Sequence, residues 1–236
     1  MADALFLGAH PDDVEILAGG LVARLCAEGR HVVIADATRG EMGSRGTPEE
    51  RDQEAADAAR IFGCRRVNLR LPDGRIGDDI PAATRAVVRA LREHRPRLVF
   101  VHEQGDHHPD HNALSIATKY ACFQANVVNY DTGQERWKIG RLYHYVGSRH
   151  RWPQKATLVV DVTAWWPTKI AALRAHRSQF ANPDYAGPET FVSSPAAWDM
   201  IETRAKFFGS LVDAQYGEPL CTEAPLRVDD LLGLPM

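Results

Sequence analysis

The chain has 236 residues, of which 44% are hydrophobic, 25% charged and 8% aromatic, the composition of an ordinary soluble globular protein. Its formal net charge is −3, from 28 Lys and Arg residues against 31 Asp and Glu residues, which argues against a nucleic-acid-binding or membrane-surface protein. Because the sequence shows neither an apolar run of about 20 residues nor a signal-peptide pattern, we expect a cytoplasmic protein whose four dispersed cysteines are reduced.

The first half of the chain alternates between predicted strands and helices. Short apolar runs bounded by turn residues predict buried strands, and apolar residues repeated at helical spacing predict helices. In chain order, the predicted elements are a strand at 4–9, a helix at 14–27, a strand at 31–38, a helix at 47–62, a strand at 67–71, a helix at 81–94 and a strand at 98–102. This alternation implies parallel strands with right-handed crossovers, so a Rossmann-like layer covers at least the first 125 residues.

The second half predicts further strands near 141–146 and 157–162, and helices near 163–180 and 195–216. The intervening stretch 181–195, with Asn, Pro, Gly and Ser, predicts a loop. No composition shift marks a linker and no internal repeat is present. We therefore expect a single α/β domain over residues 1–236: a Rossmann-like three-layer sandwich with a mostly parallel sheet, completed by the C-terminal strands and helices.

Histidine is unusually concentrated in one short segment. The chain holds 10 histidines in 236 residues, yet four of them, His102, His107, His108 and His111, fall within the window 102–111. Asp106 and Asp110 are interleaved with them. This local excess indicates a functional site.

Two polar motifs follow predicted strands, at 10–13 and at 106–111. The carboxyl ends of parallel strands meet at one edge of a sheet, where ligands bind. His10 and Asp13 are three residues apart, as are His108 and His111, and residues at that spacing share a face of a helical turn. Two imidazoles and one carboxylate are a common ligand set for catalytic zinc, which lowers the pKa of its bound water toward about 7.

The remaining polar groups suit the hydrolysis of an amide or ester. Asp12 diverges from Asp13, because adjacent side chains point apart, and could take a proton from the metal-bound water. A histidine that does not bind the metal could protonate a leaving amine or stabilise an oxyanion. Asp110 could fix the tautomer of that histidine by accepting a ring N–H.

The motif AHPDD at 9–13, combined with HPDH at 108–111, resembles the LmbE/PIG-L family of metal-dependent N-acetylglucosamine deacetylases. The glycine loop at 38–47 and the turn LPDG at 71–74 are also similar to the family pattern. The segments AHRSQF at 175–180 and YGEP at 216–219 are similar to its bacillithiol-biosynthesis branch. The resemblance extends over nearly the whole chain.

This resemblance implies a role for each site residue. The implied metal ligands are His10, Asp13 and His111. The implied catalytic residues are Asp12 as general base, His108 as general acid and oxyanion partner, and Asp110 as the carboxylate that orients His108. The implied sugar-binding residues are Arg51 and Asp73. Two positions depart from the family pattern and bear on substrate preference. His107 stands where close relatives often carry Arg, and Ala197 or Trp198 falls near a Tyr that lines the site in some relatives.

The resemblance further implies Zn²⁺ as the cofactor, although iron(II) also accepts this ligand set. The implied substrate is a small N-acetylglucosamine (GlcNAc) conjugate of the N-acetylglucosaminyl-malate type, with chitooligosaccharides or an antibiotic sugar as alternatives. By analogy with relatives, we expect a homo-oligomer, a trimer or hexamer, with no nucleic-acid or membrane partner.

Other interpretations compete with this one. Asp13 is a common type of helix cap, and Asp73 in Pro-Asp-Gly is a common turn residue for local reasons. A nucleotide-binding module is a second hypothesis, although Asp12 and Asp13 replace the glycine fingerprint and would repel a pyrophosphate. A non-catalytic metal-binding protein is a third. A two-carboxylate glycosidase fits poorly, because adjacent aspartates cannot flank a bond from both sides.

Overall fold

The computed structural model describes residues 1–147, 156–180, 182 and 185–225. Within these residues, seven strands form one mixed sheet in the order β3-β2-β1-β4-β5-β7-β6. The strands are β1 Ala4–Gly8, β2 Val32–Asp36, β3 Arg65–Asn68, β4 Leu98–His102, β5 Arg141–Tyr145, β6 Leu158–Asp161 and β7 Gly217–Cys221. Strands β1 to β5 pair in parallel, whereas β7 runs antiparallel to both β5 and β6. The expected α/β class with a mostly parallel sheet is confirmed.

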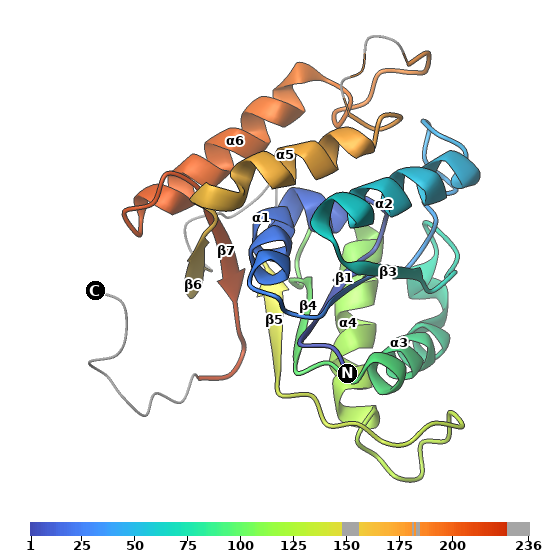
Figure 1. The fold of residues 1–236 in the computed structure, drawn as a ribbon. Coiled ribbons are helices and arrows are strands. Elements are labelled where there is room, and N and C mark those ends of the chain that lie inside the picture. Colours follow the sequence, from blue (N-terminus) through green and yellow to red (C-terminus); the bar gives the residue numbers. More distant parts are fainter. Residues whose placement is uncertain (148–155, 181, 183–184, 226–236) are drawn as a thin grey trace.

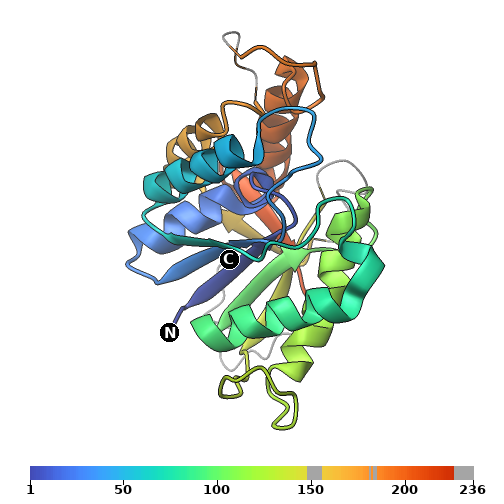
Figure 2. The ribbon, with the colours of Figure 1, turned by 90° about the vertical axis from the view of Figure 1, so that its right-hand side faces the viewer.

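Helices cover both faces of the sheet and complete the three layers (Figures 1 and 2). Their bounds are α1 Asp13–Ala27, α2 Pro48–Phe62, α3 Ile80–His94, α4 Pro109–Gln124, α5 Trp166–Ala175 and α6 Pro195–Ser210. Helices α1, α2 and α5 share one core with the sheet, and α3 and α4 share the other. No helix among the described residues has the length and apolar character needed to cross a lipid bilayer.

The central strands are apolar on both faces because each face packs against helices. In β1, Leu5 and Leu7 belong to the core beneath α3 and α4, whereas Ala4 and Phe6 belong to the core beneath α1 and α2. This alternation follows from the two-residue period of a strand. The short apolar runs of the sequence therefore correspond to doubly covered parallel strands.

The sheet places the two polar motifs next to each other. The chain leaves β1 toward β2 on one side, and β4 pairs with the other side of β1. Such a reversal of strand order opens a crevice at the carboxyl ends of the two strands. The segments that follow β1 and β4, at 9–13 and 103–111, both begin at this crevice.

The C-terminal part differs from the prediction. The helix expected at 163–180 ends at Ala175, and the one expected at 195–216 ends at Ser210, so that β7 follows soon after it. β7 has no apolar run to mark it, since Glu218 and Pro219 lie at its centre. Glu218 is instead buried against Lys169 and the backbone of α1. In the expected loop 181–195, residues 185–194 contain no helix or strand, whereas 181, 183 and 184 lie outside the described residues.

Candidate active site

The loop from β1 to α1 carries three of the expected residues, His10, Asp12 and Asp13. The backbone N–H of His10 donates to Asp13 Oδ2 at 2.8 Å, which fixes the Asp13 carboxylate at the start of the helix. Asp12 has φ 122°, a conformation that L-residues rarely adopt. Strained backbone of this kind persists where the surrounding structure enforces it, often at active sites.

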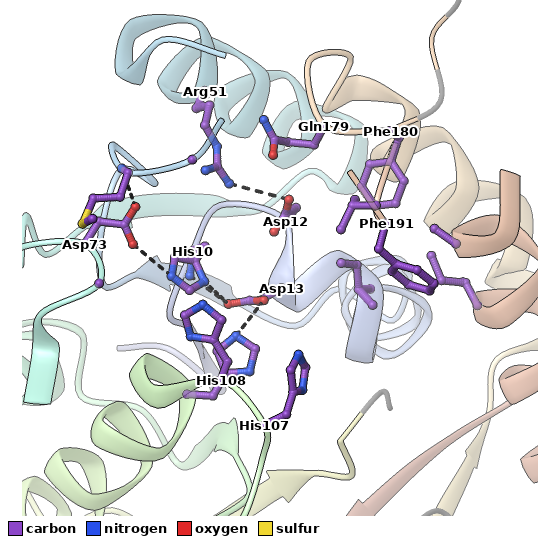
Figure 3. Close-up of a pocket in the computed structure, with 18 of the residues that line it drawn as sticks. His10, Asp12, Asp13, Arg51, Asp73, His107, His108, Gln179, Phe180 and Phe191 are labelled. Carbon is purple, nitrogen blue, oxygen red and sulfur yellow. Dashed lines mark hydrogen bonds and ion pairs between the residues drawn. The ribbon is translucent and has the colours of Figure 1, made fainter. Parts of the chain in front are cut away.

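Asp13 lies at the centre of a cluster of imidazoles. Its Oδ1 lies 3.3 Å from His111 Nε2, and its Oδ2 lies 3.4 Å from His10 Nδ1 and 3.3 Å from His102 Nε2. Potential ligand atoms within 4.8 Å of one another form three overlapping sets, His10 with His108 and His111, Asp13 with His102 and His111, and His10 with Asp73 and Asp110. The fold thus brings together every expected metal ligand, of which Figure 3 labels His10 and Asp13.

His108 occupies the N-cap of α4, where its Nδ1 accepts the backbone N–H of Asp110 at 3.2 Å. This bond leaves Nε2 as the nitrogen available to a ligand. The His108 ring packs edge-on against His10, with centroids 4.7 Å apart, and lines the pocket. Burial, together with the neighbouring His10 and His111, lowers the pKa of His108.

The carboxylate of Asp110 has other partners than the expected His108 ring. It accepts the backbone N–H groups of Gly74 at 2.7 Å and Ile76 at 3.2 Å, and it lies 3.4 Å from His10 Nε2. Asp73 Oδ1 lies 3.1 Å from the same His10 nitrogen. The geometry therefore makes Asp110 a positioning group for His10 and for the turn that carries Asp73.

Arg51 reaches the β1 loop from α2. Its guanidinium donates to the carbonyls of Gly40 at 3.0 Å and Pro11 at 2.9 Å, and lies 3.6 Å from Asp12 Oδ2. Gly40 has φ +70°, and a side chain there would collide with the guanidinium. Burial raises the pKa of Asp12 to about 6 even though Arg51 acts in the opposite direction. The contacts in the structure link Arg51 to the proposed base.

Two further residues complete the cluster and were not assigned roles from the sequence. Asp106 accepts the His108 backbone N–H at 2.9 Å and lies 3.3 Å from His111 Nδ1. His102 accepts the backbone N–H of Ala9 at 3.2 Å and stacks on His111, with centroids 3.9 Å apart. Burial lowers the pKa of His102 to about 4. Both residues lie in the histidine-rich window 102–111, which marked them as candidates. The window did not indicate which groups they would contact.

A cavity of about 370 Å³ opens onto this cluster. Its lining includes all the expected site residues except Asp110, and also includes His107 and Ala197. Gln179 and Phe180 enter it from the segment after α5, which is anchored because Glu54 accepts both the N–H and the hydroxyl of Ser178 at 2.7 Å. Trp198 packs on Phe180, with centroids 5.1 Å apart.

Known proteins are similar to this chain in sequence and in fold. The model of the PIG-L family, described as GlcNAc-PI de-N-acetylase, matches residues 5–122. The chain is 30% identical to a 1D-myo-inositol 2-acetamido-2-deoxy-alpha-D-glucopyranoside deacetylase of Segniliparus rotundus, over 75% of this chain and 76% of that protein. Among solved structures, the conserved protein TT1542 from Thermus thermophilus is 35% identical, with a TM-score of 0.87 over 98% of this chain and 99% of that one. An N,N'-diacetylchitobiose deacetylase from Pyrococcus horikoshii, 23% identical over 93% of this chain and 83% of that one, shares the fold with a TM-score of 0.75.

Proposed function

Because the chain belongs to the PIG-L family of deacetylases, we propose that it is a metal-dependent hydrolase that removes the N-acetyl group from a small GlcNAc conjugate. One observation carries this proposal: the Asp13 carboxylate lies among three imidazoles, and Asp13 and the buried Asp12 both line a cavity of about 370 Å³. Aspartates at the start of α1 also disfavour the alternative of a nucleotide-binding module, since they would repel a pyrophosphate.

The donor set fits a catalytic metal ion. Neutral imidazoles and one carboxylate bind zinc with a position left for water, and iron(II) accepts the same donors. His10, Asp13 and His111 would hold the ion, with His102 packed behind His111. A bound zinc ion would lower the pKa of its water and polarise the amide carbonyl.

The chain's own residues would supply the proton transfers. Asp12 accepts a proton from the water whose oxygen bonds to the acetyl carbon, and Arg51 holds Asp12 in place. His108 donates a proton to the amide nitrogen as the carbon–nitrogen bond breaks, which releases acetate and the free amine. Asp73 and Asp110 hold His10 from the other side. Asp73 also lines the cavity and would accept a hydrogen bond from a sugar hydroxyl.

The aglycone has three candidates, malate, an inositol and a second sugar. N-acetylglucosaminyl-malate was expected from the bacillithiol branch, whereas the relative in Segniliparus rotundus is named for an inositol conjugate. Chitooligosaccharides are a further alternative, supported only by the chitobiose deacetylase that shares the fold. A cytoplasmic location and a homotrimer or homohexamer are likewise predictions.

A panel assay tests the proposal. The metal-free protein is reloaded with zinc or iron(II) and incubated with the malate, inositol and chitobiose conjugates of GlcNAc, and the free amine is quantified. We expect metal-dependent amine release from at least one conjugate, and the highest kcat/KM identifies the aglycone. Absence of amine release with every metal and conjugate would refute the deacetylase proposal.

A further inference from the structure

The cavity changes character from one end to the other. Its lining includes Arg51, Asp73 and Gly74, and also Phe180, Phe191, Val192, Met200 and Ile201. Phe180 and Ile201 belong to one hydrophobic cluster, and Val192 and Met200 pack against it. In Figure 3, Asp73 and Phe191 are at opposite ends, with His10 and Asp13 between them. We call the five residues Phe180, Phe191, Val192, Met200 and Ile201 the apolar wall.

The apolar wall combines a rigid base with an exposed rim. Phe180 and Ile201 are buried and belong to a hydrophobic cluster with Trp166, Leu173 and Ala205. Phe191, by contrast, is 40% exposed although it lines the cavity. An aromatic ring exposed at the edge of a cavity offers apolar surface that a ligand can remove from water.

The scissile amide carries a sugar on its nitrogen and an acyl group on its carbonyl carbon. The polar end of the cavity suits the sugar, and the apolar end suits the acyl group. The amine side of an N-acylated sugar carries hydroxyl groups, which lose free energy when buried without hydrogen-bond partners. The Asp73 carboxylate lines the polar end of the cavity and has lone pairs that can accept hydrogen bonds from such hydroxyl groups. With the sugar there and the amide at the histidine cluster, the acyl group is directed toward the apolar wall. An acetyl methyl group would leave much of that wall exposed.

We propose that the apolar wall binds the acyl side of the scissile amide, so that the protein prefers N-acyl glucosamine conjugates with chains longer than acetyl. This inference rests on the proposed amide-hydrolase function and adds the substrate class. Each methylene that is fully buried strengthens binding about fourfold. Because the rim is open, we expect a gain in kcat/KM of about tenfold or more from acetyl to hexanoyl.

Two matched substrate series test the proposal on the metal-loaded protein. The first varies the acyl group of N-acylglucosamine through acetyl, butanoyl, hexanoyl and octanoyl. The second keeps the N-acetyl group and places alkyl chains of the same lengths on the anomeric oxygen. A rise in kcat/KM confined to the acyl series supports the proposal. A flat or falling acyl series, or a rise in the glycoside series alone, overturns it, while cleavage of the N-acetyl compounds still supports deacetylase activity.

Two variants test whether the apolar wall causes the dependence of kcat/KM on acyl-chain length. Phe191→Ala should lower the octanoyl-to-acetyl ratio of kcat/KM about tenfold, whereas Phe123→Ala, which removes a 75% exposed ring from α4, should leave this ratio unchanged. Equal ratios in the two variants would overturn the assignment. If no amide is cleaved, the dissociation constants of N-octanoylglucosamine and N-acetylglucosamine are measured by calorimetry. Binding of the octanoyl compound at least tenfold tighter supports the proposal, and equal binding overturns it.

Discussion

The Arg51 guanidinium lies 3.6 Å from the carboxylate of Asp12, and both side chains are buried. Arg51 also donates to the carbonyl of Pro11, so it holds both the side chain and the backbone of the β1 loop. Burial raises the pKa of Asp12 to about 6, whereas Arg51 favours its charged form. A carboxylate in this setting is suited to accept a proton near neutral pH.

Asp12→Asn should abolish most turnover while the metal stays bound. Asn is nearly isosteric and tolerates the positive φ of this position, but it cannot accept the proton. We expect kcat to fall about 10²- to 10⁴-fold, the range for loss of a general base. The measurements are kcat on the best conjugate and metal content by elemental analysis. A normal rate would show that another group is the base.

Gly40→Ala should impair catalysis without touching a catalytic residue, because the added methyl group would displace the Arg51 guanidinium. We expect kcat to fall about tenfold or more. Gly63→Ala is the matched control: Gly63 has φ +73° against +70° for Gly40, but an added methyl group contacts nothing within 4 Å. Positive φ should cost each variant about 1 kcal/mol of stability, and Gly40→Ala should lose more because it also disturbs the Arg51 hydrogen bonds. Equal kcat values for the two variants would contradict the positioning role of Arg51.

His111→Ala should reduce the bound metal, because His111 Nε2 lies against Asp13 at the centre of the cluster. His107→Ala is the comparison, since His107 lies on the same loop with its Nδ1 2.9 Å from Asp106 and a half-exposed ring. Elemental analysis after dialysis against a weak chelator should show less than about a tenth of the metal in His111→Ala and full occupancy in His107→Ala. Unchanged metal in His111→Ala would refute its assignment as a ligand.

Lys169→Met should destabilise the fold through a buried charge. Lys169 Nζ lies 2.6 Å from Glu218, which also accepts the N–H groups of Gly20 and Leu21 and so joins α5 and β7 to α1. Removing one partner of a buried ion pair costs about 3–5 kcal/mol. Urea unfolding should report this loss, and adding Glu218→Gln should recover part of it. If the double variant Lys169→Met/Glu218→Gln were less stable than Lys169→Met alone, the unpaired Glu218 carboxylate would not be the cause of the lost stability.

The amino-acid sequence by itself determined the parallel part of the sheet and the position of the site. Apolar runs at 4–9, 31–38 and 98–102 predicted buried parallel strands in this alternating pattern, and the carboxyl ends of the first and the last carry the two motifs. The spacing of His10 with Asp13 and of His108 with His111, together with the sheet edge that both motifs share, predicted that these four side chains meet, but not that His102 and Asp106 join them.

Only the tertiary structure decided the hydrogen-bond and ion-pair partners of the polar side chains. Asp110 binds the N–H groups of Gly74 and Ile76, and His102 lies against Asp13, because backbone donors and buried contacts become available only once the strands are in register. The same holds for β7, where Glu218 is buried against Lys169 and the backbone N–H groups of Gly20 and Leu21. The apolar wall exists because Phe180, Phe191, Val192, Met200 and Ile201 line the same cavity as the side chains from the loops after β1 and β4. Residue type and spacing report local geometry, whereas hydrogen-bond partners and cavity walls depend on distances set by the whole fold.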